Sequence, residues 1–399
     1  YRHPDILPTG YNLYQFDPRL VPTEVAFKRG KTIASNTIKA YKEEEGTYPN
    51  STAVILWGLE TSRTQGETFS QILSYLGVRV VGLGSQWDPK YEIIPIEELG
   101  RPRIDVTINI CGFFRDMYPN LLAGLNELFV KLYELDETDE QNYFKANSKK
   151  IYKKLIAEGY SESDAKELAI SRIFGPREGE YGTGITDIVE SKNWEKEEEI
   201  GIAFTDSLQH VYSMKKRGQK IDGLYEENLK TVEIVSQTRS NHEYEITDLD
   251  HYYEFFGGLS KSVEMASGKK QKMYISDTTG DRIISESVEK SIGRGVRTRL
   301  LNPKWINGLL EHKYHGVQEM AKRFENIMGL AATTNSVEEW IYDDMYSKYV
   351  EDEELRKKLI ENNPYAYVDI LERMMEYYNR GYWDATEEQL NMLNKQKEK

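Results

Sequence analysis

The chain contains one cysteine, Cys111, among its 399 residues. A single thiol cannot form a disulfide within the chain or a thiolate metal cluster, so both are excluded. The sequence also has no run of about 20 apolar residues, which is the length that a helix needs to cross a bilayer. Because no targeting segment is recognisable either, the sequence predicts a cytoplasmic protein without a membrane span.

Positive charge is scarce relative to negative charge. The 52 lysines and arginines are outnumbered by 66 aspartates and glutamates, which gives a formal net charge of −14. A nucleic-acid-binding surface needs a basic patch that neutralises phosphates, so this balance argues against DNA or RNA as a partner. Hydrophobic residues make up 39% of the chain. This is enough to build cores for two or three domains at roughly 150 residues each.

Several catalytic and nucleotide-binding motifs are missing. The sequence has no HExxH, CxxC or GxSxG pattern. The segment 30–32, GKT, matches the end of a phosphate-binding loop, but Val25 replaces the first glycine and the segment falls within a predicted helix. The glycines of 81–84 and 182–184 lack the third glycine of a dinucleotide fingerprint. We therefore expect no ATP site in this chain.

Apolar runs and helical spacing alternate along the first part of the chain. β-branched runs bounded by turn residues predict buried strands, and three-to-four spacing of apolar residues predicts helices. The expected strands cover 52–57, 78–84 and 104–112, and the expected helices cover 21–46, 69–77 and 119–135. Strand and helix alternating in this way are typical of a parallel α/β layer.

The remainder of the chain differs in character. We predict an α/β class with an α/β domain at 1–140, a mainly helical region with a glycine-rich loop at 141–270, and a small α/β element followed by helices at 271–399. The second α/β element rests on the strand-like segment KMYISDTT at 272–279. The C-terminal helices are highly charged, which fits either a solvated face or a docking surface.

A polar stretch follows the first predicted strand. The sequence GLETSRTQGE at 58–67 places Glu60, Arg63, Thr64 and Glu67 where the chain passes from strand to helix. In parallel sheets, ligands bind at this carboxyl end, close to the free N–H groups of helix N-termini. A capped surface loop is the plain alternative, since a carboxylate near a first helical turn also satisfies free N–H groups.

Two further loops carry candidate ligand-binding residues. The segment GFFRDMYP follows the next strand and contains Arg115 and Asp116, which form either part of a shared site or a surface ion pair. The segment REGEYGTG is rich in glycine, so its backbone can approach a flat ligand on which Tyr181 would stack. Two polar loops at the same sheet edge favour one shared site.

Three histidines have a possible chemical interpretation. His312 and His315 are three residues apart on a predicted helix, a spacing compatible with one metal ion or with two exposed side chains. His251 lies in DLDHYYEFFGG among aromatic residues, where an imidazole also fits simple core packing. Neither pattern alone identifies a site.

These loops and several later stretches together resemble one known family. The resemblance, to the large subunit of the cobalt chelatase of aerobic cobalamin synthesis, lies in WGLETSRTQGE, ELGRPRIDVTINICGFFRDMYPN, RIFGPREGEYGTG, YYEFFGGL, LLNPKWINGLLEHKYHGVQEM and NPYAYVDILERMMEYYNRGYW. The large H subunit of magnesium chelatase is similar, somewhat less closely. The motifs run in order from about residue 11 to residue 384 and match the C-terminal portion of such a subunit, so we expect a fragment.

The resemblance implies ATP-dependent insertion of a divalent metal into a tetrapyrrole. The tyrosine-rich segments resemble the cobalt branch more than the magnesium branch, which implies Co²⁺ and a corrin-type macrocycle. A separate ATPase assembly of the AAA+ type would hydrolyse the ATP, in agreement with the missing phosphate loop. The alternatives that stay open are a magnesium chelatase H-type subunit acting on protoporphyrin, a tetrapyrrole carrier without chemistry, and an unrelated α/β ligand-binding domain.

The resemblance also implies roles for individual residues. The glutamate of the family's TxGE segment is thought to face the macrocycle, which implies that Glu67 accepts protons and transiently binds the metal, with Glu60 as an alternative. His251 is implied as a catalytic group that delivers the metal, and His312 as a further ligand. The residues implied to hold the macrocycle are Trp57, Arg63, Thr64, Arg115, Arg177, Tyr181 and Phe256, the last standing where the family typically has a histidine.

Overall fold

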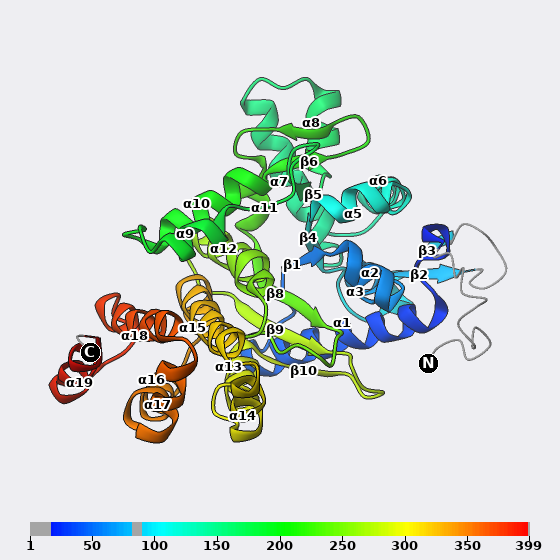
Figure 1. Cartoon of the computed structure of the whole chain (residues 1–399). Helices are drawn as coiled ribbons and strands as arrows, with labels where there is room; N and C mark the ends of the chain where they lie inside the picture. Colours follow the sequence, from blue (N-terminus) through cyan, green and yellow to red (C-terminus); the bar gives the residue numbers. More distant parts are fainter. Residues whose placement is uncertain (1–16, 82–89, 398–399) are drawn as a thin grey trace.

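The computed structural model describes residues 17–81 and 90–397, which fold around one central sheet (Figure 1). The eight strands of this sheet lie in the order β10-β9-β8-β1-β4-β5-β6-β7. The five central strands, β9, β8, β1, β4 and β5, run parallel. Strand β10 pairs antiparallel with β9, β6 pairs antiparallel with β5, and β7 pairs antiparallel with β6. The strands are β1 Ser51–Leu56, β4 Asp105–Ile110, β5 Ile173–Gly175, β6 His210–Tyr212, β7 Arg217–Lys220, β8 Val232–Arg239, β9 Lys272–Asp277 and β10 Ile284–Ser287. The expected α/β class with a parallel-rich sheet is confirmed.

Helices connect these strands and cover both faces of the sheet. Those before β8 are α1 Glu24–Glu45, α2 Gly58–Thr64, α3 Glu67–Tyr75, α4 Ile96–Leu99, α5 Gly112–Met117, α6 Pro119–Glu134, α7 Tyr143–Ala157, α8 Glu162–Ala169, α9 Ile185–Ser191, α10 Glu197–Leu208 and α11 Leu224–Leu229. Those after β8 are the π-helix η4 Tyr252–Gly257, α12 Gly258–Ser267, α13 Val288–Thr298, α14 Pro303–Glu311, α15 Tyr314–Thr334, α16 Glu339–Tyr346, the π-helix η5 Ser347–Glu351, α17 Glu353–Asn362, α18 Pro364–Asn379 and α19 Glu387–Lys397. A short 3-10 helix, η3, covers Pro18–Leu20.

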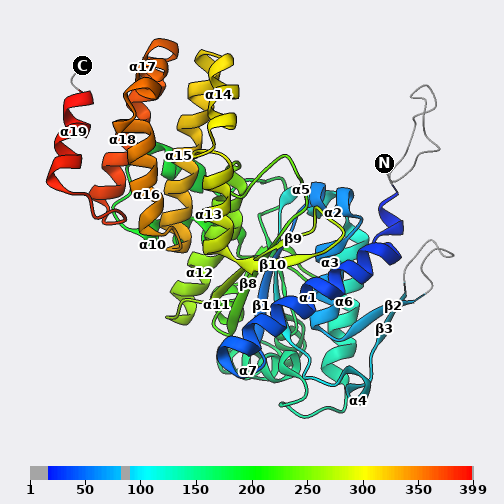
Figure 2. The same ribbon diagram turned by 90° about the horizontal axis from the view of Figure 1, so that it is seen from below.

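Strand β8 shows how the two faces of the sheet are used. Successive side chains of a strand point to opposite faces. On one face, Gln71 of α3 donates to the hydroxyl of Ser236 (3.0 Å), and the hydroxyls of Thr68 and Thr238 lie 3.0 Å apart. On the other face, Val235 packs in an apolar cluster. Helices α1 and α3 therefore cover one face, and a different set of helices covers the other (Figure 2).

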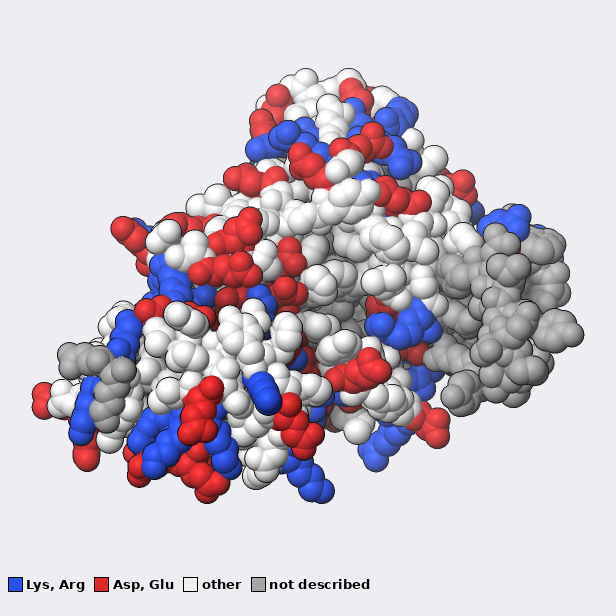
Figure 3. Space-filling view, in the orientation of Figure 1, with Lys and Arg blue, Asp and Glu red and all other residues white. Residues whose placement is uncertain are grey.

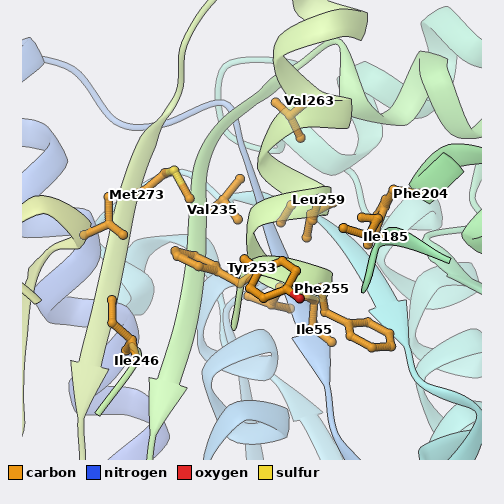
Figure 4. Close-up of a cluster of buried hydrophobic side chains, with 14 of the residues drawn as sticks. Ile55, Ile185, Phe204, Val235, Ile246, Tyr253, Phe255, Leu259, Val263 and Met273 are labelled. Atoms are coloured by element: carbon orange, nitrogen blue, oxygen red, sulfur yellow. The ribbon is translucent and has the colours of Figure 1, made fainter. Parts of the chain in front are cut away.

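The apolar cluster on the second face joins η4 and α12 to the sheet. Figure 4 shows Tyr253, Phe255 and Leu259 packed against Ile55 of β1 and Val235 of β8, with Ile185, Phe204 and Met273 nearby. A fully buried side chain of this size contributes about 1.5–3 kcal/mol relative to an exposed one. This packing fixes the π-helix at the carboxyl end of β1.

The C-terminal helices α14 to α19 gather on the side of the molecule opposite α3 (Figures 1 and 2). Helix α15 is the central member of this group, because its residues from Phe324 to Thr334 are almost all buried. It packs against both α18 and η4. The helical group is therefore connected directly to the π-helix.

Two strands differ from the sequence-based expectation. The segment expected as a strand at 78–84 enters β2 Val78–Val81, which pairs antiparallel with β3 Lys90–Ile93 in a separate two-stranded sheet; its last residues lie outside the described residues. The strand expected at 272–279 is β9, but it pairs with β8 in the main sheet and does not form a second α/β element. Residues 141–270 contain the helices α7 to α12, in line with the expected helical character, and also contribute β5 to β8 to the same sheet.

The polar segments expected as loops after β1 and β4 are short helices. Residues 58–64 form α2, and the chain then turns through Gln65 (φ 59°) and Gly66 (φ 101°) into α3. Residues 112–117 form α5, where the thiol of Cys111 accepts from the N–H of Phe114. Each polar residue of these segments therefore has a fixed place on a helix. Only some of these residues point to the same side of their helix.

Candidate functional site

A cavity of about 500 Å³ opens at the carboxyl ends of β1, β4 and β8. Trp57 and Gly58 follow β1, Cys111 and Gly112 follow β4, and Gln237 lies close to the C-terminal end of β8. The rest of the wall comes from α2, from residues 240–252, from η4 and from the glycine-rich segment at 181–182. The cavity thus lies at the sheet edge where the sequence predicts a shared site.

Large apolar side chains form an exposed rim around this cavity. Leu59, Phe113, Tyr181 and Tyr244 line it and are 68%, 46%, 53% and 37% exposed. Exposed apolar side chains gathered in one place mark a surface that binds an apolar partner or ligand. Uncharged side chains also cover much of the middle of the face shown in Figure 3, with acidic and basic patches beside them.

The floor of the cavity is aromatic. Trp57 stacks at a tilt on His251 (5.5 Å between ring centroids) and meets Phe255 edge-on (4.5 Å). His251 precedes η4 and contacts Asp250 (3.3 Å) and Glu254 (3.4 Å) through Nδ1. The hydrogen bond with Glu254 raises the pKa of His251 above its ordinary value. An imidazole, an indole and a phenyl ring therefore meet at the place where a flat ligand would lie.

Two buried carboxyl groups line the cavity. Glu254 is bound by Thr183 and His251, whereas Glu60 keeps one oxygen unsatisfied within the described part of the chain. Glu60 is 5% exposed; its Oε1 accepts from the Thr64 hydroxyl (3.0 Å), and its Oε2 is buried without a hydrogen-bond partner among the described residues. Burial, together with the nearby charge of Glu67, raises its pKa to about 7. A buried carboxyl group with one unsatisfied oxygen and a near-neutral pKa can accept and release a proton at physiological pH.

Glu67, the residue implied by the resemblance, lies behind this wall. It is 1% exposed, is not among the lining residues, and accepts a hydrogen bond from Nε of Arg29 on α1 (2.6 Å). The structure thus brings Glu60 to the cavity and gives Glu67 a cationic partner on the opposite side. Glu67, which the resemblance implies as a metal ligand, therefore does not line the cavity in this structure.

The arginines expected to hold the macrocycle have different roles. Arg63 lines the cavity and donates to the Ser240 hydroxyl (2.8 Å and 3.2 Å). Arg115 is 2% exposed and donates to Asp116 and to the backbone carbonyls of Arg177 and Glu180. Arg115 therefore anchors the glycine-rich segment from beneath, and Arg63 is the only arginine or lysine among the described lining residues.

The glycine-rich segment is held close to α5. A Cβ on Gly112 would lie 2.5 Å from the ring of Tyr181 and 2.7 Å from the carbonyl oxygen of Glu180. The Tyr181 hydroxyl donates to Asp116 (2.7 Å), and the Thr183 hydroxyl donates to Glu254 (2.8 Å). These contacts place Tyr181 on the rim of the cavity.

The remaining predicted residues lie apart from the cavity. Arg177 donates to the His210 ring, and Phe256 is 1% exposed in the core while its neighbour Phe255 lines the cavity. His312 is exposed at the C-terminal cap of α14 and is not a lining residue. Within residues 17–81 and 90–397, no three His, Cys, Asp or Glu side chains are grouped to hold a metal ion.

Sequence reasoning missed several lining residues. Gln237, whose Oε1 is buried without a partner among the described residues, lies within β8, a strand that was not predicted from the sequence. Glu254, Tyr244 and Leu59 were likewise not singled out. The run VEIVSQTRSN has the β-branched residues and the polar end that could have identified β8.

No helix in the described ranges is both long and apolar enough to cross a bilayer.

In a comparison with family models, residues 1–390 match the CobN/Magnesium Chelatase family. The chain is 35% identical to the aerobic cobaltochelatase subunit CobN of a Sinorhizobium species, with 95% of this chain and 30% of that protein aligned. It is 32% identical to the magnesium-chelatase subunit ChlH of Oryza sativa subsp. japonica, with 98% and 28% aligned.

A solved structure shows the same fold. The catalytic subunit of cobaltochelatase from Mycobacterium tuberculosis superposes with a TM-score of 0.90 at 29% identity, over 96% of this chain and 32% of that one. The chain thus spans about a third of the length of these relatives. On the match to the family model, this chain is a member of the CobN/magnesium chelatase family.

Proposed function

We propose that this chain is the macrocycle-binding part of the large subunit of an ATP-dependent chelatase, which inserts cobalt into a corrin-type tetrapyrrole. The proposal rests on the cavity at the carboxyl ends of β1, β4 and β8. This cavity has an apolar rim, an aromatic floor and, in its wall, the buried carboxyl group of Glu60 with an oxygen unsatisfied by the described residues. A separate AAA+ ATPase would supply the energy. The cobaltochelatase relatives support this reading.

The residues of the cavity fit the chemical requirements of metal insertion. Two pyrrole N–H protons must leave as the metal enters, and the metal must lose water. Glu60 lines the cavity and accepts a proton there, and its pKa of about 7 lets it release that proton again. His251 offers an imidazole to the incoming metal, and Arg63 pairs with a carboxylate on the edge of the macrocycle.

Two alternatives stay open. The magnesium-chelatase relatives have similar identities to this chain, which supports insertion of magnesium into protoporphyrin as the second candidate. A carrier would bind the macrocycle through the same rim and floor, but it would not depend on the proton-accepting group.

A fluorescence titration tests the binding proposal and chooses between the macrocycles. Metal-free hydrogenobyrinic acid diamide and protoporphyrin are added separately to the chain, and quenching of tryptophan fluorescence is followed. Because Trp57 lines the cavity, we expect saturable quenching by one of the two. Trp57→Phe should remove most of that signal, whereas Trp305→Phe, on α14 outside the cavity lining, should keep it. Absence of quenching by both macrocycles would contradict the proposal for this chain.

A further inference from the structure

Glu60 stands in the wall of the cavity, and Glu67 is buried behind it. The Thr64 hydroxyl donates to Oε1 of Glu60 (3.0 Å) and accepts from the backbone N–H of Glu67 (3.1 Å). The two carboxyl groups are close enough for the charge of Glu67 to act on Glu60. Each carboxyl group has one oxygen, Oε2, that is buried without a hydrogen-bond partner among the described residues. Two buried carboxyl groups with an unsatisfied oxygen each are costly, so their presence calls for a role.

Behind Glu67 the path reaches solvent. Arg29 binds Glu67 through Nε and the carbonyl oxygens of Thr278 (2.6 Å) and Gly280 (3.1 Å) through its terminal nitrogen. Arg29 also lines a groove of about 560 Å³ between α1 and the β9–β10 hairpin, whose walls include the exposed residues Lys28 and Arg282. Glu67 therefore lies between the cavity on one side and this groove on the other.

A close approach of two helices creates this arrangement. A Cβ on Gly30 would lie 2.5 Å from Cβ of Ser70 and 2.7 Å from the backbone nitrogen of Gln71. The absence of that Cβ lets α1 lie directly against the first turn of α3. Arg29, the neighbour of Gly30, is thereby brought to Glu67 at the start of α3.

We propose that Glu60 and Glu67 form an exit route for protons, which leads from the cavity to the groove beside Arg29. This inference rests on the proposed function, because it takes the pyrrole protons of a bound macrocycle as the source. A pyrrole N–H bond breaks and an O–H bond forms on Glu60, while the nitrogen keeps the electron pair with which it binds the metal. The proton passes to Glu67 and leaves to water in the groove, and a second passage removes the second proton.

Other charged and polar groups face this pair and set its pH dependence. Glu60 is faced by Arg63 and Thr64 of α2, by Glu67 and Thr68 of α3, and by Tyr118 after α5. Glu67 is faced by Arg29, which acts as a positioning residue because it holds the Glu67 carboxylate beside the groove. The route thus passes from a cavity-facing group to one that has a cation on its solvent side.

Infrared spectroscopy of the chain alone tests whether the two carboxyl groups are coupled. The carboxylic acid band of Glu60 is identified by its loss in Glu60→Gln, and its midpoint is followed with pH. We expect that midpoint near 7 in the parent chain and at a lower pH in Glu67→Gln, because the variant removes a neighbouring negative charge. Glu24→Gln, which changes an exposed carboxylate paired with Lys28 at the groove, is the control and should not move it. An unchanged midpoint in Glu67→Gln would overturn the route.

Hydrogen–deuterium exchange of the same band tests the direction of exit. With the macrocycle that quenches Trp57 bound and covering the cavity, the parent chain and Glu24→Gln should exchange the Glu60 proton quickly in D₂O. Glu67→Gln should exchange it slower by roughly tenfold or more, and only in the macrocycle-bound state. Equal exchange in the bound parent and Glu67→Gln would mean that protons leave through the cavity mouth, and the route would be wrong.

The two proposals fail in different ways. If neither macrocycle binds, the proposed function fails, and the titration of the unliganded chain still decides whether Glu60 and Glu67 are coupled. If Glu67→Gln does not fold, Arg29→Lys keeps a cation at the groove and Arg29→Met removes it. Only Arg29→Met should then slow exchange in the bound state, and equal exchange in both variants would overturn the route.

Discussion

At the scale of single residues, Glu60 is the group whose chemistry the function needs. We expect Glu60→Gln to keep macrocycle binding and to lower the rate of metal insertion by roughly 10²- to 10⁴-fold, because the variant removes proton acceptance and retains shape. The measurement is single-turnover metal insertion with ATPase partners added, next to a fluorescence titration. Parent-like insertion in the variant would favour the carrier alternative.

Glu60 also makes the stability of the chain depend on pH. Its pKa rises from 4.5 in the unfolded state to about 7 in the fold. The folded state therefore binds more protons between these values, and the free energy of unfolding falls as pH rises through this window. By this argument the parent loses up to about 3 kcal/mol relative to Glu60→Gln between pH 4.5 and 7.5. Urea unfolding of both chains at the two pH values measures the difference, and parallel curves would contradict it.

The residue scale also shows the limit of sequence reasoning at the site. The stretch from Glu60 to Glu67 was correctly predicted to follow a buried strand, because composition and turn residues reveal that edge. Which carboxylate faces the cavity was not predictable, since it depends on α2 ending at Thr64 and on the turn at Gly66. The partner of Glu67, Arg29, is distant in sequence and comes from another helix.

At the scale of elements, the contact between α5 and the glycine-rich segment positions the rim. Gly112→Ala would place a Cβ against Tyr181 and Glu180, and relieving that overlap should cost about 1–3 kcal/mol of stability and displace Tyr181. Macrocycle affinity should fall by about tenfold, in line with the cost of misplacing a positioning group. Gly308→Ala on α14 is the control, because its Cβ would meet nothing within 4 Å and Gly308 does not line the cavity. Equal affinities in the two variants would exclude this role for the contact.

Element boundaries followed from local patterns better than element pairing did. The expected helix at 119–135 is α6, and Gly46 (φ 76°) ends α1 as predicted. The pairing of β8 with β1 was not expected, because register and strand order depend on contacts across the whole chain. Without β8, the sequence could not assign Gln237 to the cavity.

At the scale of the whole molecule, an ion pair at the opposite edge of the sheet holds several elements together. Arg172 before β5 is 1% exposed and binds both oxygens of Asp105 in β4 (2.8 Å and 3.2 Å) and the hydroxyl of Ser148 in α7. Arg172→Met leaves Asp105 buried without its cation, which should cost about 3–5 kcal/mol. The effect should appear in urea unfolding and leave macrocycle affinity at the distant cavity unchanged.

The control for this prediction is an exposed ion pair. Arg217 and Glu178 are 56% and 58% exposed, so Arg217→Met should cost no more than about 1 kcal/mol. If Arg172→Met and Arg217→Met lowered the free energy of unfolding equally, burial of the Arg172–Asp105 pair would not explain its contribution to stability.

The strand order also governs how the chain can fold during synthesis. Among the strands of this sheet β1 is made first, but one of its two neighbours, β8, is made only after β4 to β7, and β9 follows later still. Until β8 leaves the ribosome, one edge of a fully buried strand stays open to pairing with other chains. Nascent chains that end before Val232 should therefore aggregate or recruit chaperones, whereas chains that extend past Asp277 can close this edge and protect it.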